Sequence, residues 1–333
     1  MSDTLGIMVH PGDGGKPYHL DSDRAQMLSL LRTVAITGWK GKKYYYKTTF
    51  HIPEARDFNI ILIPTKTVMV GYYDVYLAIV ERRIEKMEMS GEYLNIEMND
   101  NLYQFSPVFE PEKIFYIQVC GYPKQTGSFG IQLAGMNGIS TLSDQNRLGY
   151  CVYRGKVSLG SLGQWRVPDS IPNRGQCLVF ARTETAGAAI GMTHDKVIVN
   201  NDVACELSVV IFSSGFPLQK PDWGVVIYNA SGQPTYSSHY TPFFLGEMIA
   251  VRNGQGRTKN IARPMVQVNQ LAKLVDSRGK GYFWFFDSGF SFSGNTITIN
   301  RVGRYNTEYA QQDWFSYRPI DYDIYAINFD DYF

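Results

Sequence analysis

Residues 223–238 read WGVVIYNASGQPTYSS, and this stretch decides the fold that we predict for the chain. An apolar run is followed by Ser231-Gly232 and then by a second run that contains Tyr236. Glycine adopts positive φ angles at no steric cost and Ser before it supports a turn, so the chain is able to reverse here between two strands. Gly224 lies inside the first run, where it favours a bulge or the close approach of another backbone. The stretch therefore predicts a β-hairpin.

Two other stretches repeat this pattern without gaps. Residues 5–19 read LGIMVHPGDGGKPYH and residues 129–143 read FGIQLAGMNGISTLS. In every copy two glycines lie eight residues apart, and the second one follows Asp, Asn or Ser. Three copies in one register indicate a common structural unit. We predict three β-hairpins with the second glycine at or beside the turn, and the paired glycines are Gly6 and Gly14, Gly130 and Gly138, and Gly224 and Gly232.

The repeats divide the chain into three modules, which span residues 1–125, 126–218 and 219–333. Pieces of this size are typical of β-sandwich domains, and the borders carry the Gly, Pro and Ser of short connectors. Aromatic residues make up 14% of the chain and charged residues 19%, a bias that favours strands. We therefore predict an all-β protein of three antiparallel β-sandwich-like modules, each opening with a related β-hairpin.

The charge balance and the apolar runs limit the classes of partner. A formal net charge of +1 creates no global field that attracts nucleic acid or an anionic membrane. The longest apolar runs, such as residues 60–63, are far shorter than the roughly 20 residues of a membrane helix, and the first residues lack a signal-peptide pattern. We expect a soluble protein without a nucleic-acid partner and without membrane insertion. The four cysteines form no C-x-x-C pair, which predicts buried, reduced thiols.

The motifs that mark common enzyme classes do not occur in the chain. It contains no G-x-S-x-G, no H-E-x-x-H and no G-x-x-x-x-G-K-[ST] sequence. Residues 254–259, GQGRTK, lack the following helical pattern of a phosphate-binding loop, and the histidines never occur at metal-ligand spacing. We expect a protein that is not an enzyme and has no cofactor and no metal site. A glycan-degrading enzyme is the third hypothesis, because a carboxylate pair needs only to converge in space.

Two stretches rich in aromatic residues are the candidate interaction surfaces. Residues 39–47, WKGKKYYYK, interleave cations with aromatic rings, a pattern that suits phosphates and stacked rings, although we favour an edge strand protected by lysines. Residues 317–333 combine acids with aromatic rings, and we favour a last core strand over a sugar platform or a subunit contact. The candidate contact residues are Trp39, Lys42, Lys43, Tyr45, Tyr322, Tyr325, Phe329, Tyr332 and Phe333.

The hairpin at residues 223–238 resembles the opening of small phage and prophage tail-region proteins. Those proteins typically read Y-G-[IVL]-x-[IV]-x-N-x-x-G-x-x-x-[FYL]-[DS]-S. Trp223 replaces the opening Tyr, and the other two copies keep mainly the glycines and the apolar positions. The resemblance implies a virion tail component, such as a tail-tip, baseplate or fibre-attachment protein, which is assembled in the host cytoplasm.

The leading functional hypothesis is a structural component of a bacteriophage tail that binds neighbouring virion proteins. Three modules without recognisable chemistry motivate it, and a homo-oligomer in a symmetric assembly is the expected arrangement. The alternative is a receptor-binding protein that recognises a bacterial surface glycan, which the aromatic excess favours.

Overall fold

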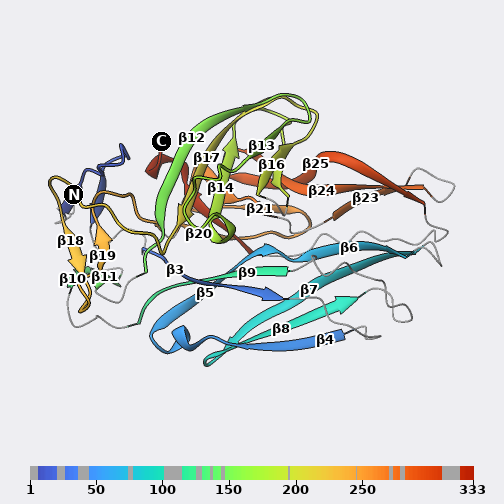
Figure 1. The fold of residues 1–333 in the computed structure, drawn as a ribbon. Coiled ribbons are helices and arrows are strands. Elements are labelled where there is room, and N and C mark those ends of the chain that lie inside the picture. The colour runs from blue at the N-terminus through green and yellow to red at the C-terminus, as the bar shows by residue number, and fades with distance from the viewer. Residues whose placement is uncertain are drawn as a thin grey trace.

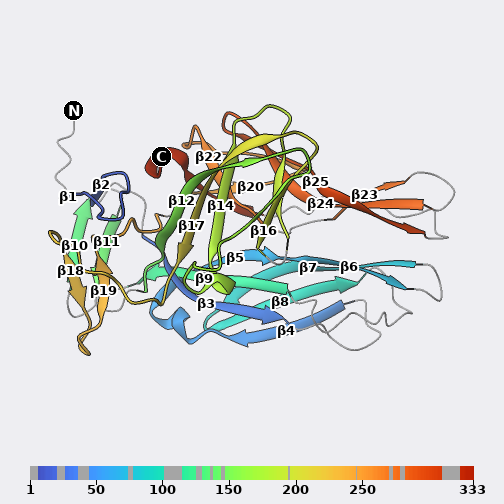
Figure 2. The ribbon, with the colours of Figure 1, turned by 45° about the horizontal axis from the view of Figure 1, so that its top comes forward.

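The computed structural model shows an all-β protein, and neighbouring strands of the described residues pair in antiparallel fashion (Figures 1 and 2). The structure describes residues 7–20, 27–36, 45–73, 78–100, 115–124, 130–135, 138–143, 147–193, 196–244, 246–269, 273–277, 282–309 and 323–333. Within these ranges the helices are single 3-10 turns, η1 (Pro53–Arg56), η2 (Arg174–Gln176) and η3 (Phe329–Asp331). None of the helices in these ranges is long and apolar enough to span a membrane.

Two sheets from the first third of the chain pack face to face as a β-sandwich. The three-stranded sheet has the order β3 (Ser29–Ile36), β9 (Phe115–Pro123), β5 (Phe58–Lys66). The four-stranded sheet has the order β4 (Tyr45–His51), β8 (Tyr93–Asp100), β7 (Ala78–Ser90), β6 (Val68–Tyr73). Alternate side chains of β8 and β9 fill the space between the sheets, because successive side chains of a strand point to opposite faces.

A second, larger sandwich contains most of the remaining strands. Its six-stranded sheet has the order β12 (Tyr150–Leu159), β17 (Cys205–Ser213), β14 (Leu178–Thr183), β22 (Pro264–Gln267), β26 (Asp323–Asn328), β20 (Glu247–Ala250). The facing sheet has the order β13 (Gln164–Arg166), β16 (Val197–Asn200), β15 (Ile190–Met192), β24 (Tyr282–Ser293), β25 (Thr296–Tyr309), β21 (Gln255–Arg257), and β23 (Lys273–Ser277) also pairs with β24. Two clusters of buried, mostly aliphatic side chains lie between these sheets.

The expectation of three sandwich modules is therefore corrected to two sandwiches. The six-stranded sheet combines strands from both sides of the expected border at residues 218 and 219, because β14 pairs with β17 on one side and with β22 on the other. Every residue of β14 is buried, so this strand needs a neighbour along both of its edges. The segment after residue 219 supplies the second neighbour.

The three predicted β-hairpins are all present. They are β1 (Ile7–Val9) with β2 (Tyr18–Leu20), β10 (Gly130–Gly135) with β11 (Gly138–Ser143), and β18 (Val226–Tyr228) with β19 (Pro234–Ser237). Gly14 and Gly232 lie in turns with φ angles of 75° and 74°, and Gly138 begins β11 opposite Gly135, beside the turn. The hairpins do not each open a sandwich, however. They gather at one end of the molecule, which we call the hairpin end (Figures 1 and 2).

The first and third hairpins share one register. Val9 pairs with Tyr18 and Ile227 pairs with Tyr236, and these are equivalent positions relative to the two glycines of the repeat. The second hairpin closes differently, since Leu133 pairs with Ser140. The repeat therefore predicts the type of element in all three copies and the strand register in two of them.

A further cluster of buried side chains joins the hairpin end to both sandwiches, and we call it the junction core. The rings of Phe212 and Phe243 stack inside it with centroids 4.4 Å apart. Its members come from β1, β2, β3, β5, β9, β12, β14, β17, β18, β19, β22 and β26 and from segments between and after them, and include Val9, Tyr18, Leu20, Leu30, Cys120, Tyr150, Phe180, Phe212, Tyr236, Phe243, Phe244 and Tyr332. Residues far apart in sequence thus fix the hairpin end onto the sandwiches.

Candidate functional site

The first aromatic stretch, residues 39–47, lies only partly within the described residues. Trp39, Lys42 and Lys43 are outside them. Tyr45 begins β4, which is an edge strand of its four-stranded sheet. On the same strand the Lys47 ammonium pairs with the Glu97 carboxylate at 2.6 Å. The position of β4 agrees with the interpretation of this stretch as an edge strand.

The second aromatic stretch supplies a core strand where the structure describes it. Tyr322 lies outside the described residues. Strand β26 runs between β22 and β20, so both of its edges are paired. Tyr332 is only 2% exposed, and its hydroxyl donates to the Pro242 carbonyl and accepts from the Phe244 amide. The remaining candidates are partly buried against the junction core, and they are Tyr325, Phe329 and Phe333.

The hairpin end is held together by buried tyrosine hydroxyls. The hydroxyl oxygens of Tyr18 and Tyr236 lie 2.8 Å apart, which joins equivalent residues of the first and third hairpins. The Tyr150 hydroxyl of β12 donates to the Thr235 carbonyl and accepts from the Ser237 amide. Burial raises the pKa of Tyr236 to about 12 and also raises the pKa values of Tyr18 and Tyr150. The three hydroxyls therefore stay protonated at neutral pH.

An acidic side chain fixes the turn of the first hairpin. The Asp13 carboxylate accepts from the Gly15 amide at 2.7 Å and from the Arg154 guanidinium of β12 at 2.8 Å. Its second oxygen accepts from the Thr241 amide at 3.2 Å. Charge-assisted hydrogen bonds of this kind are stronger than neutral ones. Asp13 thus connects one hairpin to the larger sandwich and to the segment that follows the third hairpin.

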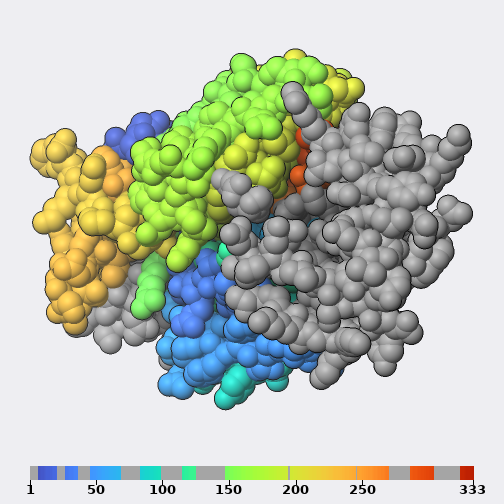
Figure 3. Space-filling view, turned by 45° about the vertical axis from the view of Figure 1, so that its right-hand side comes forward, coloured from blue at the N-terminus to red at the C-terminus, as the bar shows by residue number. Residues whose placement is uncertain are grey.

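The outward faces of the hairpin end carry large apolar side chains. Trp223 is 93% exposed, and Met8 and Tyr228 are 50% and 40% exposed. Ile7 is exposed as well. In the space-filling view the third hairpin protrudes at this end of the molecule beside the N-terminal segment (Figure 3). Exposed aromatic and Met side chains are typical of surfaces that bind other proteins.

A second candidate site is a cavity of about 650 Å³ between the two sandwiches, which we call the interlobe cleft. One wall is the outer face of the three-stranded sheet. Phe115, Ile117 and Val119 of β9 point into the first sandwich, so Tyr116 and Gln118 between them face the cleft. The other wall comes from η2 and from the ends of β13, β15 and β16, and its main polar residues are Arg166, Arg174, Thr193 and Lys196.

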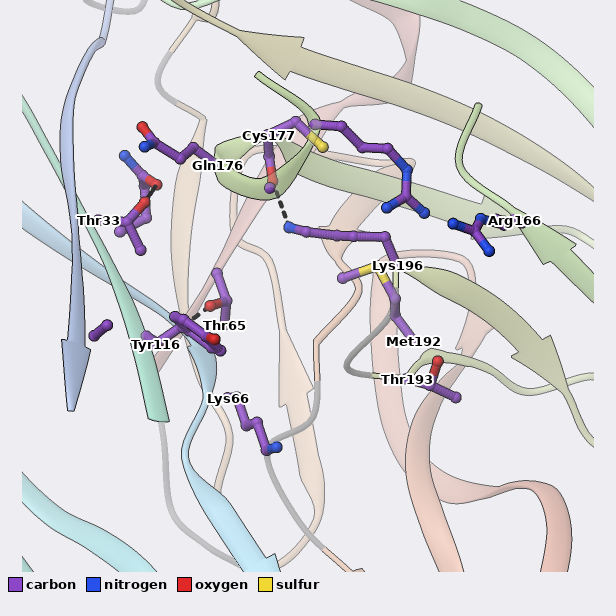
Figure 4. A pocket seen from close by; sticks show the side chains of 14 residues that line it. Thr33, Thr65, Lys66, Tyr116, Arg166, Gln176, Cys177, Met192, Thr193 and Lys196 are labelled. Atoms are coloured by element: carbon purple, nitrogen blue, oxygen red, sulfur yellow. Dashed lines mark hydrogen bonds between the residues drawn. The ribbon is translucent and has the colours of Figure 1, made fainter. Parts of the chain in front are cut away.

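The described lining of the interlobe cleft is cationic. Lys66, Arg166, Arg174 and Lys196 line it, and no acidic side chain does so among the described residues. The Lys196 ammonium donates to the Cys177 carbonyl at 2.7 Å and reaches into the cleft (Figure 4). Asp169 lies beside the cleft, with its carboxylate 3.4 Å from both Arg166 and Arg174. A cavity of this size and polarity suits a small anionic or polar ligand.

Residues 6–311 match the model of a family that is described as a family of unknown function, DUF6453. The chain belongs to this family. The matched residues of this DUF6453 member contain all three hairpins and the four cations of the interlobe cleft, and they end before β26. No curated protein matches the chain, and no solved structure matches it.

Sequence patterns gave no sign of the interlobe cleft in this DUF6453 member. Its cations lie at positions 66, 166, 174 and 196, on elements of both sandwiches. Only tertiary packing brings such distant residues together, so no local spacing marks them. The Asp13 contact has the same origin, because Arg154 is 141 residues away along the chain.

Proposed function

We propose that the protein is a structural component of a bacteriophage tail, in a tail-tip, baseplate or fibre-attachment position, and that it binds neighbouring virion proteins through the hairpin end. The observation that carries the proposal is the gathering of three related hairpins at one end, with Trp223, Met8 and Tyr228 exposed there. The resemblance of the third hairpin to phage tail-region proteins supports the setting.

The physical argument starts from the two faces of the hairpins. The inner faces of the first and third hairpins are fixed by the Tyr18–Tyr236 hydrogen bond and by the junction core. Their outer face is therefore presented on a rigid support, which lowers the entropic cost of binding. Trp and Tyr supply much of the binding energy in protein interfaces. The strands at the ends of short sheets also leave backbone groups that pair with another chain.

Immunogold labelling of virions with an antibody to this chain tests the proposal. We expect gold particles on the tail, and a symmetric homo-oligomer should give repeated labelling at one position along it. Virions whose tails carry no label, while a known tail protein is labelled in the same preparation, would refute the tail assignment and the virion localisation together.

A second candidate function is a receptor-binding protein that recognises a bacterial surface glycan. The specific observation in its favour is the interlobe cleft, whose walls combine hydroxyl and amide groups with the ring of Tyr116. Such groups suit sugar hydroxyls and sugar ring faces. Binding of the purified protein to host cells, and its loss after removal of the surface glycan, distinguishes this function from a purely structural one.

A further inference from the structure

The interlobe cleft contains a partly buried lysine, Lys196, whose charge no acidic side chain of the described residues neutralises. The Lys196 ammonium has a backbone carbonyl as its hydrogen-bond acceptor, and no ion pair of Lys196 exists among the described residues. A buried charge is costly unless an opposite charge or several hydrogen bonds compensate for it. An anion in the cleft would supply that compensation.

Backbone geometry fixes Lys196 in this position. The residue has a φ angle of 60°, which side chains other than glycine rarely adopt. Its amide donates to the Thr193 carbonyl, which closes the turn between β15 and β16, and its carbonyl accepts from the Val167 amide at 3.0 Å, which extends the pairing of β13 with β16. The turn conformation therefore sets the direction in which the Lys196 side chain leaves the backbone.

Three further cations surround the same space. Lys66 is only 9% exposed at the end of β5, on the opposite wall from Lys196. The Arg174 guanidinium donates to the Val167 carbonyl at 2.9 Å, which orients it beside the cleft. Burial lowers the pKa of the Lys196 ammonium, and the charge of Arg174 adds to that effect. Asp169 partly compensates Arg166 and Arg174, and an anion in the cleft would favour the charged form of Lys196 beside Arg174.

We infer that the interlobe cleft binds a small anionic ligand that carries phosphate or carboxylate groups. Lys and Arg are the side chains that form charge-assisted hydrogen bonds with such groups. The Thr193 hydroxyl lines the cleft on the side of Lys196. On the opposite wall the Thr33 hydroxyl donates to the Gln118 side-chain oxygen at 2.7 Å, and the Gln118 amide donates to the Arg32 carbonyl at 3.0 Å, so these two side chains shape the wall. This inference deepens the second candidate function, and it does not depend on the tail assignment.

One glycine of the cleft allows a test that leaves the lysines in place. Gly175 lies in η2 and lines the cleft, and a Cβ atom added to it meets nothing within 4 Å. Gly175→Glu therefore introduces a negative charge at the cleft with open space at its Cβ position. Gly160 also has open space around its Cβ position and does not line the cleft. Gly160→Glu is thus a matched control with the same change in charge.

Isothermal titration calorimetry on the full chain measures binding of inorganic phosphate, glucose 6-phosphate, glucuronate and glucose. We expect the phosphorylated or the carboxylated probe to bind at least about tenfold more tightly than glucose, and the preferred probe identifies the anionic group. Gly175→Glu and Lys196→Met should weaken that binding about tenfold or more, and Gly160→Glu should leave it unchanged.

Two results would overturn the inference. One is the absence of binding for every anionic probe at millimolar concentration. The other is equal weakening by Gly160→Glu and Gly175→Glu, which would show that net charge rather than the cleft controls binding. Because these measurements use purified protein, their failure leaves the immunogold result on the tail assignment unaffected.

Discussion

The hydrogen bond between Tyr18 and Tyr236 provides a quantitative test of how the hairpin end is assembled. The two hydroxyl oxygens are 2.8 Å apart, and both side chains are almost fully buried. The substitution Tyr18→Phe removes the hydroxyl that is the hydrogen-bond partner of the Tyr236 hydroxyl among the described residues. A buried hydroxyl without a partner costs about 1–3 kcal/mol, so we expect this loss in the free energy of unfolding of the hairpin end.

The double variant separates this hydrogen bond from other effects of the substitutions. When both residues are Phe, no unpaired hydroxyl remains from the pair, and the remaining loss is the longer contact of 3.4 Å between the Tyr18 hydroxyl and the Tyr240 carbonyl. The sum of the two losses in the free energy of unfolding for the single variants should therefore exceed the loss for the double variant by about 1 kcal/mol or more. Tyr93→Phe on the exposed face of β8 is the matched control, and we expect a change within about 0.5 kcal/mol.

Native-state amide hydrogen exchange is the appropriate assay, because it reports the opening of one part of a multi-lobed protein. Peptides that cover residues 7–20 and 226–237 should lose protection together in each single variant. The direct coupling of the two hairpins would be refuted if the losses in the free energy of opening for the two single variants add up, within about 0.5 kcal/mol, to the loss for the double variant.

Three further predictions concern pH, thiols and the C-terminal segment. Burial raises the pKa of Tyr236 to about 12, whereas an unfolded tyrosine has a pKa of about 10. The free energy of unfolding, measured with urea, should therefore stay constant with respect to this group up to about pH 10 and fall above it. A free energy of unfolding that rises above about pH 10 would contradict this prediction. Burial raises the pKa of Cys151 to about 12, so a disulfide reagent should label the four buried cysteines only in denaturant; rapid labelling of native protein would disprove their burial. Deleting Asn328–Phe333 should produce aggregation, because Tyr332 leaves the junction core, and a soluble variant with unchanged Tm would show that this segment is not needed for folding.

Local patterns in the sequence predict the hairpins well, for a clear physical reason. The turns of the first and third copies need a positive φ angle at Gly14 and Gly232, and glycine adopts it without strain. The alternation of apolar and polar residues then fixes which side of each strand is buried. The all-β class follows from the same patterns and from the aromatic composition.

The arrangement of the sheets was not predictable from such patterns. Strand β14 pairs with β22, which lies more than eighty positions later in the chain, and no turn signal connects the two. A two-stranded hairpin is too small to bury a core of its own, so the first and third hairpins pack into the junction core instead of opening separate modules. The cations of the interlobe cleft depend on the same long-range packing.

Incorporation of hairpin-surface variants into virions tests the central claim most directly. A triple variant, with Met8, Trp223 and Tyr228 each changed to Ser, removes exposed apolar groups from the hairpin end. A double variant, with Tyr93 and Met248 each changed to Ser, removes comparably exposed groups elsewhere and is the control. Both proteins should fold with the Tm of the parent, because exposed side chains contribute little to stability. Each is supplied to phage that lack the parent gene, and purified virions are compared by immunoblot. The account predicts that the hairpin variant is depleted about tenfold or more while the control is retained. Incorporation of the hairpin variant at the parent level would contradict it.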